Sequence, residues 1–236
     1  MSIPFLFLLT LSVAQVSQPK EGVILLHGLC RTDASMNKME EKLSQAGFIV
    51  ENVAYPSRTA SIETLADEAL GQALERSNLK DCPKIHFVTH SMGGILVRSY
   101  YARHEYGRLG RVVMLGPPNR GSEVVDRLKS WTLFQKMNGP AGGEMGTDAD
   151  STPNTLGPVN FECGIIAGDR SINWINSLAM IDGKDDGKVS VENTKVDGMK
   201  EHLVVHTTHT FMMRNNKVIE ATLRFLQNGT FNKADN

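Results

Sequence analysis

One stretch, residues 85–95, constrains the fold of this chain more than any other. It reads Ile-His-Phe-Val-Thr-His-Ser-Met-Gly-Gly-Ile. A short apolar run leads to a serine and two glycines, and an apolar pattern with helical spacing follows. This order predicts a buried strand, a sharp turn at Ser91 and a helix that begins directly after the turn. Gly93 and Gly94 would let that helix approach the strand closely.

Further apolar runs of strand length alternate with segments of helical spacing along the chain. The strand-like runs begin near residues 23, 48, 112, 163 and 203, and the clearest helix pattern covers 62–74. Strands that are apolar throughout are typical of parallel sheets, which helices cover on both faces. We therefore expect one α/β domain over residues 15–236, with a mostly parallel sheet between two layers of helices.

The N-terminal residues have the pattern of an export signal. Residues 3–11 are mostly apolar but too short to cross a bilayer, and Ser12-Val13-Ala14 supplies the small residues that signal peptidases require. We expect residues 1–14 to be a signal peptide and the protein to be secreted or periplasmic. Because the segment contains no Lys or Arg, an uncleaved apolar arm or a lipid-facing anchor remains the alternative.

The charge of the chain argues against a nucleic-acid partner. Lys and Arg number 25, Asp and Glu number 26, and no basic block occurs. Acidic loop residues could supply oxygen ligands for Ca²⁺, but they lack the spacing of an EF-hand, and we expect no metal site. The acidic residues in question are Asp148, Asp150, Asp182, Asp185 and Asp186.

The three cysteines also lack the spacing of metal ligands. Cys30, Cys82 and Cys163 are expected to be small buried apolar residues. An odd number leaves open whether two of them form a disulfide.

Chemically useful side chains follow three of the predicted strands. Ser91 comes first, Asp185 and Asp186 lie in a later glycine-rich loop, and His206 and His209 follow the last strand. The carboxyl ends of parallel strands meet at one edge of a sheet, so these groups could lie together. A serine, a histidine and a carboxylate within reach of one another are the groups that nucleophilic catalysis requires.

With these features the chain resembles the α/β-hydrolase superfamily, in particular its lipase and esterase group with an "HG" loop and an "HSMGG" nucleophile elbow. Thr89 departs from the G-x-S-x-G pattern of the elbow, where it replaces the first glycine. The resemblance implies an α/β-hydrolase fold with a small cap insertion. It rests on residues 26–29, 89–94, 117–122 and 186–189 and on His209.

The resemblance also implies a role for each candidate. Ser91 would be the nucleophile, and His209, which lies beyond the last strand, would be the general base. Asp186 directly precedes a Gly-x-Val segment, as the family's acid does, and would orient the histidine. Asp185 and His206 are the alternatives for the acid and the base. No cofactor is expected.

Two further features of the site follow from the resemblance and from composition. The backbone N–H groups of Leu29 and Met92 would form the oxyanion hole. Residues from about 119 to 158 interrupt the strand–helix alternation and would form a cap over the pocket. One amphipathic helix is expected from Val124 to Phe134, with loop after it. Three large apolar residues of the cap could line an acyl site: Trp131, Phe134 and Met137.

The expected function is a serine hydrolase of carboxylic esters, either an esterase or a lipase. Its substrate would be a small-molecule or lipid ester, with transient contact to a lipid surface as an additional expectation. An acyltransferase or a thioesterase would use the same three side chains. A non-catalytic binding protein on a hydrolase scaffold is the alternative from a different class. The sequence does not determine the oligomeric state.

Overall fold

The computed structural model describes residues 20–105, 107–171, 181 and 183–233. Within this part of the chain, six strands form one parallel sheet in the order β2-β1-β3-β4-β5-β6. The predicted α/β class with a parallel sheet is confirmed. The expected signal peptide, residues 1–14, lies outside the described residues. The strands are β1 Gly22–Leu26, β2 Ile49–Val53, β3 Ile85–His90, β4 Leu109–Leu115, β5 Cys163–Gly168 and β6 Glu201–Val205.

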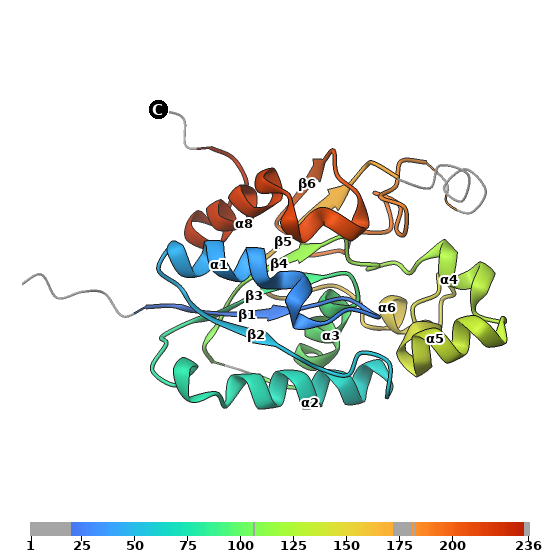
Figure 1. The fold of residues 1–236 in the computed structure, drawn as a ribbon, viewed down its shortest axis with the longest axis horizontal. Coiled ribbons are helices and arrows are strands. Elements are labelled where there is room, and N and C mark those ends of the chain that lie inside the picture. Colours follow the sequence, from blue (N-terminus) through green and yellow to red (C-terminus); the bar gives the residue numbers. More distant parts are fainter. Residues whose placement is uncertain (1–19, 106, 172–180, 182, 234–236) are drawn as a thin grey trace, which may run out of the picture.

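Helices cover both faces of this sheet (Figure 1). The helices α1, Asn37–Gln45, and α8, Asn216–Asn228, lie on one face, and α2, Ile62–Leu74, and α3, Met92–Tyr101, lie on the other. None of the described helices is long and apolar enough to cross a membrane. Short 3₁₀ helices lie in the described connections: η1 Asp33–Met36, η2 Ser77–Leu79 and η3 His209–Arg214.

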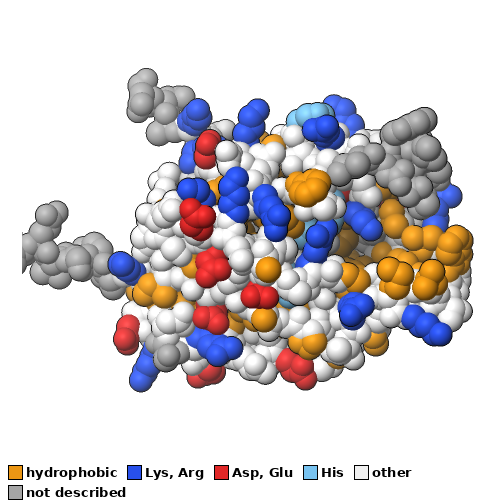
Figure 2. Space-filling view, viewed as in Figure 1, with side chains coloured by type: hydrophobic (Ala, Val, Ile, Leu, Met, Phe, Trp, Pro, Cys, Tyr) orange, Lys and Arg blue, Asp and Glu red, His pale blue; other side chains and the backbone are white. Residues whose placement is uncertain are grey.

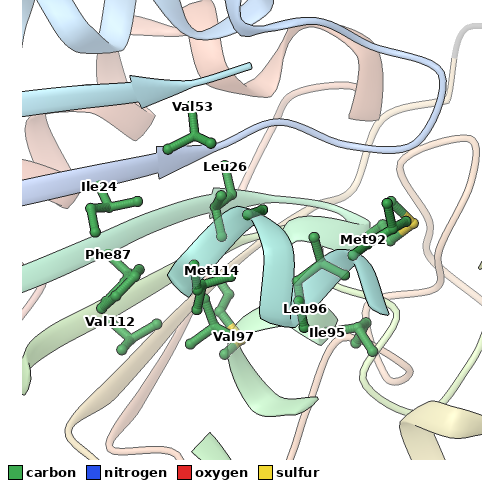
Figure 3. Packing of buried hydrophobic residues seen from close by; sticks show 14 of the residues in the cluster. Ile24, Leu26, Val53, Phe87, Met92, Ile95, Leu96, Val97, Val112 and Met114 are labelled. Atoms are coloured by element: carbon green, nitrogen blue, oxygen red, sulfur yellow. The ribbon is translucent and has the colours of Figure 1, made fainter. Parts of the chain in front are cut away.

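The apolar side chains of the strands point alternately into two separate cores. In β1, Ile24 and Leu26 join the core beneath α2 and α3, whereas Val23 and Leu25 join the core beneath α1 and α8. Figure 3 shows the first of these cores, in which side chains of α3 pack against those of the central strands. Because both faces of β1 and β5 are covered, the sequences of these two strands carry no charged or strongly polar side chain.

Residues with suitable side chains or backbone freedom mark the helix ends. The hydroxyl of Ser61 accepts a hydrogen bond from the N–H of Thr64 at 3.2 Å, which satisfies one free donor at the start of α2. Gly229 has a φ of 73° just after α8, a left-handed conformation that ends the helix at little cost for glycine.

The segment between β4 and β5 differs from the expected single helix followed by loop. It contains α4, Glu123–Leu128, α5, Thr132–Gly143, and α6, Thr152–Thr155. The helical conformation is interrupted at Trp131, whose backbone is extended. Val125 and Phe134 are nine residues apart and would face about 180° away from each other on one straight helix. The break lets both side chains face the same cavity.

Gly139, Gly142 and Gly143 do not lie in the expected loop, because α5 continues through them with a kink, whereas Gly146 and Gly157 lie outside the helices. Gly139 has a φ of 65°, and a side chain there would collide with the carbonyl oxygen of Arg58. Pro140 follows, at a position where the missing N–H of proline costs nothing because a new helical turn begins. The kink therefore brings α5 against the loop that contains Arg58.

A buried arginine connects this segment to the rest of the domain. The guanidinium of Arg98 in α3 donates hydrogen bonds to both oxygens of Asn119 and to the carbonyls of Pro153 and Gly157, at 2.7 to 3.2 Å. Arg98 is 5% exposed, and burial lowers its pKa to about 10. The charged group thus ties both ends of the 119–158 segment to α3.

We predict that Arg98→Met destabilises the protein by about 3 kcal/mol, because it leaves several buried acceptors without a donor. Arg103→Met is the matched control, since Arg103 pairs with Glu63 and Asp67 at the surface and should contribute less than about 1 kcal/mol. Urea unfolding measures both changes. Equal effects of the two substitutions would contradict a structural role specific to Arg98.

Candidate active site

Ser91 lies between β3 and α3 in a strained backbone conformation. Its φ of 54° and ψ of −125° are unusual for a residue other than glycine. The N–H of Ser91 donates a 2.8 Å hydrogen bond to the carbonyl of Leu115, at the end of β4. This bond holds the turn against the neighbouring strand, so the position of the serine is fixed by the sheet.

Two glycines allow α3 to leave this turn at close range. A Cβ on Gly93 would lie 2.8 Å from the carbonyl oxygen of Leu26 in β1. A Cβ on Gly94 would lie 3.3 Å from Oγ1 of Thr89, the residue that departs from the G-x-S-x-G pattern. The second glycine therefore leaves room for the larger side chain at position 89.

His209 is bound to Asp186 through both its ring and its backbone. Its Nδ1 donates a 2.7 Å hydrogen bond to Oδ2 of Asp186, and its N–H donates a 2.9 Å bond to the Asp186 carbonyl. The other carboxylate oxygen accepts 3.0 Å bonds from the N–H groups of Lys188 and Val189. The Asp186 side chain is fully buried, so these bonds fix both its position and that of the imidazole.

This geometry determines what the imidazole can do. Since Nδ1 carries the proton that bonds to Asp186, the neutral ring has its lone pair at Nε2. His209 and Ser91 both line the same cavity. The imidazole can therefore accept a proton within this cavity, while the carboxylate behind it stabilises the charged ring.

The alternative acid and base of the sequence analysis are engaged elsewhere. Oδ1 of Asp185 accepts a 2.6 Å hydrogen bond from the N–H of Gly187, which stabilises the loop itself. Nδ1 of His206 lies 2.9 Å from Oδ1 of Asp169, and 73% of the His206 side chain is exposed. Neither Asp185 nor His206 lines the cavity.

Two further histidines hold the loops around the site. Nε2 of His90 donates a 3.0 Å hydrogen bond to the carbonyl of His209, and the centres of the two rings are 4.7 Å apart. The ring of His27 stacks on Tyr55 with 4.1 Å between ring centres, and the Tyr55 hydroxyl donates to the His27 carbonyl at 2.5 Å. Burial lowers the pKa of both histidines, which favours neutral rings.

The two predicted oxyanion donors occupy suitable elements. Met92 is the first residue of α3, so its N–H has no acceptor within the helix. Leu29 lines the cavity in the loop after β1. This loop lies close to the serine, because a Cβ on Gly28 would be 3.0 Å from the Cβ of Ser91. Cys30 continues the loop with a φ of 56°.

The cavity has a volume of about 270 Å³ and is bounded on one side by the 119–158 segment. Val125 of α4 and Phe134 of α5 lie in its wall. Trp131 and Met137 do not line it, and 61% and 55% of these residues are exposed. Their predicted place in an acyl site is therefore corrected, because both side chains face solvent.

Cys30 is also placed differently from the expectation of a buried apolar residue. It is exposed, whereas Cys82 and Cys163 are buried, and all three are free thiols. The Cys30 thiol donates to the carbonyl of Met137 at 3.3 Å and lies 3.4 Å from Oδ1 of Asn138. These contacts connect the loop after β1 to α5, so the two sides of the cavity are joined.

Several residues of the cavity wall were not predicted from sequence. Asn138 and Met145 come from the segment expected to be loop, and Arg31 and Lys188 are cations that adjoin predicted motifs. The adjacency of Arg31 to the "HG" loop and of Lys188 to Asp186 was the available signal. Among the described residues, no group of three or more His, Cys, Asp or Glu side chains is arranged to hold a metal ion.

Solved structures with the same fold share this arrangement of strands and helices. The chain is similar to the mature Bacillus licheniformis lipase BlEst2, with 20% identity, a TM-score of 0.68 and coverage of 92% of this chain and 96% of that one. It is similar to the metagenomic carboxyl esterase MGS0156, with 18% identity, a TM-score of 0.63 and coverage of 82% and 66%. A bromoperoxidase from Bacillus anthracis gives 18% identity, a TM-score of 0.62 and coverage of 89% and 92%.

These similarities show that the chain has the α/β-hydrolase fold. No protein-family profile matches the chain, and no curated protein sequence matches it either. Activity must therefore be argued from the site itself.

The burial of His90 predicts a pH dependence of stability. Burial holds the pKa of His90 well below its usual 6.5, so the unfolded chain binds a proton that the folded chain does not. The free energy of unfolding should therefore fall as the pH drops below about 6.5. In His90→Gln the slope should be shallower by up to about 1.4 kcal/mol per pH unit. Urea unfolding between about pH 5 and 7.5 measures this slope. Identical slopes in the two proteins would refute the prediction.

Proposed function

We propose that the chain is a serine hydrolase that cleaves carboxylic esters through an acyl-enzyme intermediate. The observation that carries the proposal is the buried hydrogen bond from His209 to Asp186, which directs the basic nitrogen of the ring away from the carboxylate. Ser91 lies on a strained strand-to-helix turn and lines the same cavity as His209. A serine activated by a carboxylate-bound histidine is the arrangement that acyl transfer requires.

The reaction begins when Oγ of Ser91 attacks the ester carbonyl and Nε2 of His209 takes the hydroxyl proton. The N–H groups of Leu29 and Met92 stabilise the oxyanion, and Asp186 stabilises the imidazolium. The bond from the carbonyl carbon to the alcohol oxygen breaks, and His209 returns its proton to the departing alcohol. Water then attacks the acyl-serine by the same sequence, which releases the acid and restores Ser91.

The cavity wall favours an ester substrate with an apolar acyl group, and the outer surface of the 119–158 segment favours contact with lipid. The side of the cavity formed by the 119–158 segment carries Val124, Val125, Phe134 and Met145. Burying an acyl chain against such side chains stabilises the complex by about 25 cal/mol per Å² of apolar surface removed from water. Exposed Trp131, Leu133 and Met137 on the outside of this segment would allow the transient contact with a lipid surface that the sequence led us to expect.

We predict that Asp186→Asn lowers kcat for a soluble ester such as 4-nitrophenyl butanoate by about 10⁴-fold, because the amide favours the wrong histidine tautomer. Asp185→Asn is the matched control. It retains an acceptor for the N–H of Gly187 and should keep activity within about tenfold of the wild type. Steady-state hydrolysis, with circular dichroism to establish folding, compares them. Equal losses in two folded variants would show that Asp186 does not have the proposed role.

A further inference from the structure

The catalytic cavity has two chemically different sides. Apolar side chains come mainly from the 119–158 segment, and two cations, Arg31 and Lys188, lie among the remaining lining residues. Figure 2 looks onto a face where Lys and Arg side chains lie beside the apolar surface of the region around α4 and α5. No Asp or Glu lines the cavity within the described part of the chain. Arg31 and Lys188 therefore contribute a charge of about +2 to the lining at neutral pH.

Neither cation has an acidic partner among the residues that the structure describes. Within the described residues, the side chains of Arg31 and Lys188 take part in no hydrogen bond or ion pair. Other cations of the chain are paired, for example Arg111 with Glu162 and Arg120 with Glu192. The two cavity cations are therefore available to an anionic ligand.

The backbones that carry these cations are held firmly. The N–H of Lys188 donates to Asp186, and its carbonyl accepts a 2.8 Å hydrogen bond from the hydroxyl of Ser122. The N–H of Arg31 donates to the carbonyl of Gly28 in the loop after β1. Lys188 thus follows Asp186 by two residues, and Arg31 follows Gly28 by three. The backbone of each cation is therefore hydrogen-bonded to a residue next to the catalytic groups.

Each cation is connected to the catalytic histidine by chain neighbourhood or by its charge. Lys188 is two residues beyond Asp186, the partner of His209. The positive charge of Arg31 acts on His90, whose ring packs against His209. In the proposed reaction His209 gives its proton to the departing alcohol, so the alcohol part of the ester must lie near His209 and within reach of the cations that line the same cavity. The acyl part then lies toward the apolar side chains of the 119–158 segment.

We propose that Arg31 and Lys188 bind an anionic group, a carboxylate or a phosphate, on the alcohol part of the ester. This inference rests on the proposed function and names its substrate class: an ester with an apolar acyl chain and a negatively charged alcohol. The carboxylates of Asp185 and Asp186 do not line the cavity beside such a ligand. The first bonds its own loop and the second is buried behind His209.

A matched pair of substrates tests the proposal. The esters 3-carboxy-4-nitrophenyl butanoate and 3-carbamoyl-4-nitrophenyl butanoate have the same acyl group and nearly the same shape, but the first alone carries a negative charge. The wild type should favour the anionic ester by roughly tenfold in kcat/KM, after correction for the uncatalysed rates. The preference should fall as salt rises from about 20 mM to about 500 mM, because salt screens exposed charges.

Substitution identifies the residues responsible. The double variant Arg31→Gln/Lys188→Gln should lose the preference, and each single variant should lose part of it. Lys184→Gln removes a charge from the same loop as Lys188 but outside the cavity. This variant should retain the preference for the anionic ester. The measured quantity is the ratio of kcat/KM for the anionic ester to kcat/KM for the neutral ester. A general loss of activity lowers both values and leaves this ratio unchanged. A wild type without preference, or a double variant that keeps it, would overturn the proposal.

Binding separates this proposal from the proposed chemistry. Ser91→Ala can be titrated calorimetrically with both esters, and tighter binding of the anionic ester supports charge recognition even if the wild type turns over neither. Turnover of both esters with no preference in rate or binding overturns the inference and leaves the hydrolase proposal standing.

Vesicles of phosphatidylglycerol and phosphatidylcholine distinguish two sources of the anion. A preference for phosphatidylglycerol in addition to the soluble anionic ester assigns a lipid headgroup. A preference confined to the soluble pair assigns a free small ester. Equal rates within both pairs count against the proposal.

Discussion

The buried carboxylate of Asp186 is the constraint on which the rest of the site depends. Its two oxygens accept three hydrogen bonds, two from its own loop and one from His209, and its carbonyl accepts a fourth from the His209 backbone. A buried charge is tolerated when all its bonds are made. The loop after β5 and the segment after β6 are thereby joined at one point.

Close backbone contacts extend this constraint to the serine. Gly116 has a φ of 55°, and a Cβ there would lie 3.0 Å from Oδ2 of Asp186. The preceding residue, Leu115, accepts the hydrogen bond that fixes Ser91, and His90 in turn binds the carbonyl of His209. The ends of β3 and β4 therefore fix the positions of the serine and the histidine relative to each other, as preorganised catalysis requires.

The sequence predicts those parts of the structure that are determined by residues close together in the chain. The strand runs and the turn at Ser91 were predictable, because apolar periodicity and paired glycines are properties of short segments. The helices between β4 and β5 were not, since the kink at Gly139 depends on close packing against a distant residue, Arg58. The apolar pattern likewise did not separate Phe134, which lines the cavity, from the exposed Trp131 and Met137.

The charged side of the cavity shows the same limit. Arg31 and Lys188 are ordinary polar residues in sequence, and what distinguishes them is the lack of an acidic partner on the described cavity wall. Such a property belongs to the folded surface, because it depends on where every other charge lies. Arg98 is similar, since nothing local indicates that its four acceptors come from residues 119, 153 and 157.

Covalent labelling tests the central claim most directly, namely that Ser91 is a nucleophile activated by His209 and Asp186. The protein would be treated with a fluorophosphonate, its intact mass measured, and the modified peptide sequenced. The account predicts one adduct per chain, located on Ser91, absent in Ser91→Ala and formed much more slowly in Asp186→Asn. A folded wild-type protein that forms no adduct, or forms it on another residue, would contradict the account.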